Sequence, residues 1–94
     1  MKYAVNTTWK HSKPIDWDQM NKLLEEGMEE APEGGITYWF EIDSHTHGSL
    51  SIFESKEAFD SHKKRVDERR KESTDSGIVM TSENVGLIKA EYNS

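Results

Sequence analysis

The sequence contains no cysteine, only two prolines among its 94 residues, and no long hydrophobic run. The absence of cysteine excludes disulfide bonds, thiolate nucleophiles and metal centres built on cysteine. No apolar stretch approaches the roughly 20 residues that a transmembrane helix needs, and Met1 leads directly into strand-like sequence rather than into an apolar leader. We therefore expect a soluble cytoplasmic protein with no membrane contact.

Positive charge is also scarce, since 12 lysines and arginines stand against 18 aspartates and glutamates and leave a net charge of −6. Phosphate backbones repel a chain of this charge, so nucleic acid is not an expected partner. Hydrophobic residues make up 33% of the chain, with three each of Trp, Tyr and Phe, which is enough for a compact core. We expect residues 1–94 to form a single domain, small enough to gain stability from association with a second copy.

Several segments have the alternation or the composition of β-strands. Residues 44–48 form a short link rich in turn-forming residues, which predicts an antiparallel hairpin between the strands on either side of it. Polar residues interrupt the last strand-like region, which predicts a split or bulged strand there. The predicted strands are 2–10, 36–43, 50–54 and the pair of runs 78–81 and 85–92.

Two helices begin at recognisable capping residues. Asp16 can cap the first helix, with Gln19 at the reciprocal capping-box position, and Ser55 can cap the second. The first helix should stop before Pro32 and the second before Gly77. Each helix has one apolar face, made of Trp17, Met20, Leu24, Met28 and Ala31 in the first and of Ala58, Phe59, His62 and Val66 in the second.

The order strand, helix, strand, strand, helix, strand predicts an α+β, ferredoxin-like βαββαβ fold. In this fold one antiparallel sheet carries two helices on one face. The strands also place large apolar residues on both of their sides, among them Tyr38 and Trp39 on opposite sides of one strand. An apolar sheet face that the helices do not cover usually marks an interface. We therefore expect a homodimer.

The chain resembles the antibiotic biosynthesis monooxygenase-like family of the dimeric α+β barrel superfamily in the run Ile52-Phe53-Glu54-Ser55, Glu57-Ala58-Phe59 and His62. In that superfamily two sheets meet face to face, and each subunit keeps a pocket between its helices and its own sheet. The resemblance implies a homodimer that binds a small aromatic molecule. It implies, as the candidate activity, a cofactor-independent monooxygenase acting on quinol-like or polyketide-like aromatics. A non-catalytic dimeric binding protein is the alternative.

Such an oxygenase needs an apolar pocket with one base and a few hydrogen-bond donors. His62 is the candidate base and Asn6 the candidate donor to an oxyanion, while Tyr38, Trp39 and Phe59 are the candidate substrate contacts. Each has a structural alternative: His62 fits a hydrogen-bonded core position, Asn6 can satisfy backbone groups, and Trp39 can belong to the core or to an interface. Phe59 is also expected in the packed core, and the sequence does not fix which sheet face carries Asn6.

Cofactors are not expected. Haem-degrading proteins of the same superfamily combine an early-strand Asn, a helix Trp and a later helix His. Here Asn6 matches by placement, but His62 stands near the Trp place, and Glu72 stands ten positions further on where the histidine would be. His45 and His47 flank one residue of the hairpin turn near Asp43, a weak pattern without a fixed further ligand, so no metal site is expected.

Overall fold

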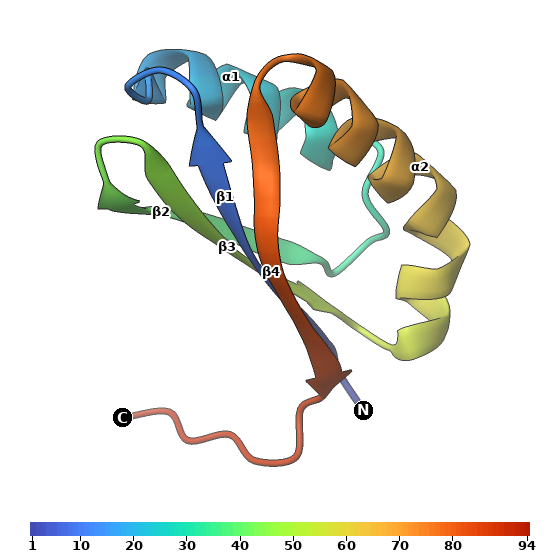
Figure 1. The fold of residues 1–94 in the computed structure, drawn as a ribbon. Helices are drawn as coiled ribbons and strands as arrows, with labels where there is room; N and C mark the ends of the chain where they lie inside the picture. Colours follow the sequence, from blue (N-terminus) through green and yellow to red (C-terminus); the bar gives the residue numbers. More distant parts are fainter.

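The computed structural model describes residues 1–94, and its elements follow the predicted order. The strands pair in the order β2-β3-β1-β4, antiparallel throughout, and both helices lie on one side of this sheet (Figure 1). The prediction of a ferredoxin-like α+β fold is therefore confirmed. The elements are β1 (Tyr3–His11), α1 (Trp17–Met28), β2 (Ile36–Asp43), β3 (Thr46–Phe53), α2 (Lys56–Asp75) and β4 (Ile78–Leu87).

Both predicted caps are present. The Asp16 carboxylate accepts hydrogen bonds from the backbone N–H groups of Asp18 and Gln19 at 3.0 and 3.2 Å, and the Ser55 hydroxyl accepts from the N–H of Ala58 at 3.0 Å. These bonds satisfy amides that a helix start otherwise leaves without a partner. Helix α1 ends at Met28, three residues before the predicted end of its apolar stripe.

The side of the sheet that faces the helices, here called the inner face, carries the odd-numbered residues of β1 because strand side chains alternate. Tyr3, Val5 and Phe53 of this face form a buried cluster with Phe59 of α2. The Phe59 ring centroid lies 5.3 Å from that of Tyr3 and 5.1 Å from that of Phe53. Phe59 is only 6% exposed, so its predicted place in the core is confirmed.

Three strand boundaries differ from the prediction. Strand β1 continues to His11, β3 begins at Thr46 rather than at residue 50, and β4 is one bulged strand that ends at Leu87. The register between β4 and β1 shifts opposite Thr8 and Trp9, which is the predicted irregularity. The polar residues in β4 do not end it, because β4 is an edge strand whose side chains can stay in water while its backbone pairs with β1.

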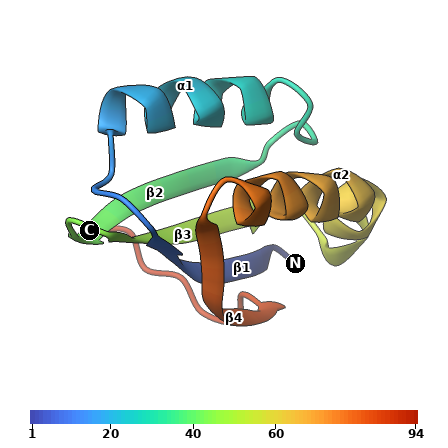
Figure 2. The ribbon, with the colours of Figure 1, turned by 45° about the horizontal axis from the view of Figure 1, so that its top comes forward.

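Helix α1 stands further from the sheet than α2 does, and makes fewer close backbone contacts with the strands. Figure 2 shows α1 along the β2 side of the molecule and α2 nearer to β4. Polar contacts hold α1 near both of its ends. The indole N–H of Trp17 donates to the Glu41 carboxylate at 3.2 Å, and Glu30, just beyond the end of α1, forms an ion pair with Arg65 of α2.

The opposite side of the sheet, here called the outer face, is apolar and uncovered in the single chain. Tyr38 is 56% exposed and Phe40 is 47% exposed. Gly48 allows the Phe40 ring to lie across β3, because a Cβ at that position would overlap the ring. The large exposed side chains of the outer face are Ile36, Tyr38, Phe40, Ile42 and Val79.

Neither helix combines the length with the hydropathy needed to cross a bilayer.

Candidate functional site

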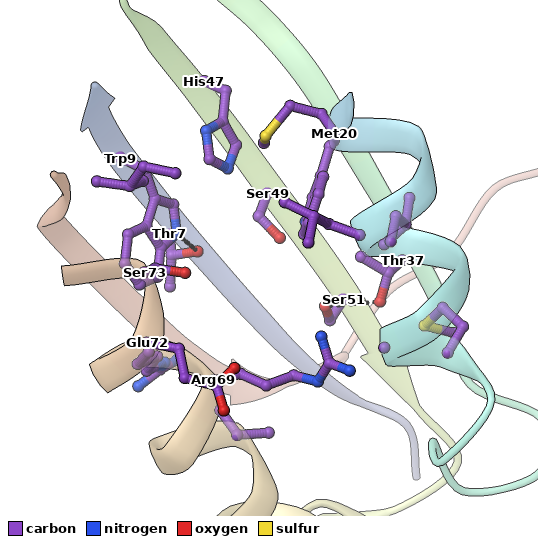
Figure 3. Close-up of a pocket in the computed structure, with 18 of the residues that line it drawn as sticks. Thr7, Trp9, Met20, Thr37, His47, Ser49, Ser51, Arg69, Glu72 and Ser73 are labelled. Carbon is purple, nitrogen blue, oxygen red and sulfur yellow. Dashed lines mark hydrogen bonds between the residues drawn. The ribbon is translucent and has the colours of Figure 1, made fainter. Parts of the chain in front are cut away.

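A cavity of about 690 Å³ lies between α1, α2 and the inner face of the sheet (Figure 3). Small-molecule sites in proteins usually have volumes of about 300 to 1,000 Å³. The cavity exists because the strands place short hydroxyl side chains where a core would need large ones, so that the sheet does not reach α1. These floor residues are Thr7, Thr37, Ser49 and Ser51.

The hydroxyls of the floor are partly paired with one another and with a tryptophan. The Thr37 and Ser51 hydroxyl oxygens lie 2.9 Å apart, and the indole N–H of Trp9 donates to the Thr7 hydroxyl at 2.8 Å. A pair of hydroxyls that share one hydrogen bond has a second O–H group left to donate. The floor therefore presents hydrogen-bonding groups to whatever occupies the cavity.

His47 occupies one end of the cavity and is only 3% exposed. All three tryptophans of the chain surround its ring. The Trp9 ring is nearly parallel to the imidazole, with ring centroids 6.3 Å apart. The Trp39 ring is tilted, with centroids 5.4 Å apart, and the Trp17 ring meets the imidazole edge-on, with centroids 6.3 Å apart. Its Nδ1 lies 2.7 Å from Nε2 of the buried His11. The second ring nitrogen of His47 has no hydrogen bond within the chain, so it is free to meet a ligand.

Burial lowers the pKa of His47 to about 4, and the neighbouring His11 adds to this effect. Burial also lowers the pKa of His11, with a further contribution from His45. Desolvation has this effect because it disfavours the charged imidazolium. Both rings are therefore neutral at pH 7, where one of them donates its N–H to the unprotonated nitrogen of the other.

His62 lies on the α2 wall of the cavity, with its ring centroid 6.4 Å from that of Phe53. Burial lowers its pKa, and the positive charges of Arg65 and Arg69 act in the same direction, while Glu30 opposes them. His62 is therefore neutral at pH 7 and able to accept a proton. Its predicted role as a base stays a prediction.

The structure brings three of the predicted site residues together and separates two from them. Trp39, Phe59 and His62 line the cavity. Asn6 and Tyr38 lie on the outer face, because they alternate with inner-face residues along their strands. The Asn6 amide donates to the backbone carbonyl of Ser49 at 3.1 Å, as in the structural alternative for this residue. The cavity of the single chain therefore has no amide from Asn6.

Sequence reasoning missed His11 and His47 because it placed both outside the strands. Each follows the strand alternation, however: His11 comes two residues after Trp9, and His47 two residues before Ser49. Arg69 was not among the predicted site residues either. Spacings of four and three residues from His62 through Val66 place Arg69 on the inward face of α2, where it lines the cavity.

Asp43 is exposed and His45 is half-buried at the β2–β3 turn, whereas His47 lines the cavity. A backbone hydrogen bond from His45 is the main reason why the pKa of Asp43 lies below its usual value. These three side chains therefore do not converge on one point. The structure contains no group of three or more His, Asp or Glu side chains placed to hold a metal ion.

Comparisons of the chain with protein-family models, with curated proteins and with solved structures found no significant match. The resemblance to the antibiotic biosynthesis monooxygenase-like family thus rests on the run from Ile52 to His62. The ferredoxin-like topology is compatible with it.

Proposed function

We propose that the protein is a homodimer that binds a small aromatic molecule in the cavity between its helices and its own sheet. The observation that carries this proposal is the cavity itself, which occupies the place where a filled core would otherwise join α1 to the sheet. Its walls combine aromatic rings with a few hydrogen-bonding groups, the usual composition of a small-molecule site. The family resemblance supports the same location, since proteins of that superfamily keep their pockets between helices and sheet.

The binding test uses the three tryptophans, all of which lie close to His47 and report on that end of the cavity. Titration with 2-naphthol should change their fluorescence with saturable dependence on concentration. Ser51→Leu should weaken this binding at least tenfold, because the larger side chain fills the floor of the cavity. Ser61→Leu, on the exposed side of α2, is the matched control and should bind as the wild type does. Equal binding by both variants would contradict the proposed site.

The homodimer is proposed because the outer face exposes large apolar side chains across β2 and β4. Two such faces packed together would form the barrel that the family resemblance implies. Light scattering should give about twice the 10.9 kDa mass of the chain. Tyr38→Glu should reduce the mass to that of the monomer, since it places a charge in the interface. A wild-type monomer at micromolar concentration would contradict the proposed dimer but would leave the proposed binding site in the cavity unaffected.

Cofactor-independent monooxygenation of a quinol-like aromatic is the second candidate. It is favoured by two neutral histidines, His47 and His62, on the wall of one cavity. A base that removes the substrate proton produces an electron-rich anion, which can react directly with O₂. One oxygen atom then enters the substrate as a carbonyl in place of a CH₂ group and the other leaves as water, so that no external reductant is needed.

The test of this candidate is oxygen consumption with an anthrone as substrate. His62→Ala should abolish turnover while the fold and the affinity for 2-naphthol are retained. His45→Ala, at the β2–β3 turn and outside the lining of the cavity, should leave turnover unchanged. If His62→Ala instead lowers thermal stability strongly with unchanged ligand binding, His62 is a core residue. Binding without any oxygen consumption would identify the protein as a non-catalytic binding protein.

A further inference from the structure

All three arginines of the chain lie on α2, and they differ in their partners. Arg65 forms ion pairs with Glu30 and Glu68, and Arg70 forms one with Glu83 at 2.7 Å. Arg69 lines the cavity and forms no ion pair at all, although Glu72 lines the same cavity one turn further along α2.

The Arg69 side chain is partly buried, and its Nε atom is fully buried without any hydrogen-bond partner in the chain. A buried Nε–H group without a partner is costly, because this group has lost water and gained no other partner. In a chain with 18 acidic side chains an internal partner would be easy to supply. The missing partner therefore points to an anion that comes from outside the chain.

The surroundings of Arg69 suit an anion. Figure 3 shows its guanidinium projecting from α2 into the cavity, toward the side that carries Thr37 and Ser51. The hydroxyls of these two residues share one hydrogen bond, so one O–H group is free to donate to a bound oxygen. Gly27 of α1 leaves room for the guanidinium, since a Cβ there would lie 3.2 Å from Nη1 of Arg69.

The end of the cavity around His47 is different, because it combines the rings of Trp9 and Trp39 with an imidazole that is neutral at pH 7. We infer that the ligand is an aromatic carboxylate, whose carboxylate binds Arg69 while its ring lies toward Trp39 and His47. A planar guanidinium can hold both oxygens of a carboxylate at once. This inference rests on the proposed function of the cavity and specifies the chemical class of its ligand.

The experiment compares 2-naphthoate with 2-naphthamide, which has the same ring and nearly the same shape but no charge. In tryptophan-fluorescence titrations the wild type should bind 2-naphthoate at least tenfold more tightly than 2-naphthamide. Arg69→Met should remove this preference by weakening 2-naphthoate binding, with 2-naphthamide affinity unchanged within twofold. Lys64→Met removes the same charge from an exposed position of α2 and should keep the preference.

Thermal unfolding separates a ligand-binding arginine from a structural one. Arg69→Met should melt at the same temperature as the wild type or higher, because it removes a partly buried charge that has no partner. A large fall in melting temperature would mean that Arg69 is structural and would overturn the inference. Equal affinities of the wild type for the two probes would also overturn it, while leaving the cavity as a binding site. Binding of neither probe, together with no binding of 2-naphthol, would overturn the proposed function and this inference with it.

Discussion

Toward α2 the sheet presents Tyr3, Val5 and Phe53, and toward α1 it presents the short side chains of Thr37, Ser49 and Ser51. The two helices lie on the same face of one sheet, but only α2 closes onto it with a cluster of buried rings. Each helix has one buried residue, Met20 in α1 and Phe59 in α2, but only Phe59 belongs to the buried cluster on the sheet. The rest of the apolar stripe of α1 faces the cavity or solvent.

This difference shows that an apolar helix face does not by itself decide how closely a helix packs. Burial needs large side chains on both partners, because interiors are close-packed and a gap loses the contacts that would fill it. Under α1, the side chains of Thr37, Ser49 and Ser51 are too short to provide them. A bound aromatic molecule would supply the missing surface, so the hollow half of the molecule is the half in which we place the ligand.

The largest expected effect is on the packed half. Phe59→Ala should lower the free energy of unfolding by about 3 to 5 kcal/mol, because it removes a buried ring that packs on Tyr3 and Phe53. Leu24→Ala, on the stripe of α1, should cost only about 1 kcal/mol, since its side chain borders the cavity. Urea unfolding of both variants measures the contrast, and equal losses would mean that α1 packs as tightly as α2.

A second effect concerns the α1 side, where His47 is buried among the tryptophans. Its pKa is about 4 in the folded chain and 6.5 in the unfolded chain, so the unfolded chain takes up a proton first as the pH falls. Stability should therefore decline from pH 6.5 to pH 4, by about 3 kcal/mol in total, and this contribution should level off at lower pH.

The measurement is urea unfolding at several pH values between 7 and 4, for the wild type and for His47→Gln. The variant should lose less stability over this range, because glutamine does not titrate. Lys64→Gln, at an exposed position of α2, serves as the control and should follow the wild type. Parallel curves for the wild type and His47→Gln would show that His47 is not buried in a way that resists protonation.

The sequence predicted the order of elements, both N-caps and the packed face of α2, because these depend on local patterns that survive in the fold. It predicted Trp39 and His62 as site residues, and both line the cavity. It could not decide whether Asn6 lies on the inner or the outer face. Both sides of that strand carry polar and apolar side chains, so the pattern does not show which side packs against the helices.

The remaining features of the site depend on distances that no local pattern contains. His11 and His47 meet because β1 and β3 pair in a particular register, and they are 36 residues apart in the sequence. The lack of an ion pair at Arg69 could not be predicted from the sequence either. A positive charge toward the C-terminal end of a helix is favourable in itself, because it interacts with the helix dipole, so the sequence gives no reason to expect a ligand there. The cavity results from the distance between α1 and the sheet, which the short side chains of three strands determine together.

The smallest effect tests the gap between the helices. Gly27→Ala should favour α1 by up to about 1 kcal/mol, because alanine is the better helix former. The new Cβ would lie 3.2 Å from Nη1 of Arg69, a close contact that a small movement of that long side chain relieves. Unfolding experiments should therefore show a small net gain in stability, and 2-naphthoate should bind more weakly than to the wild type. A loss of stability would mean that Arg69 is held firmly against α1, and hence that the two helices are joined more rigidly than the cavity between them suggests.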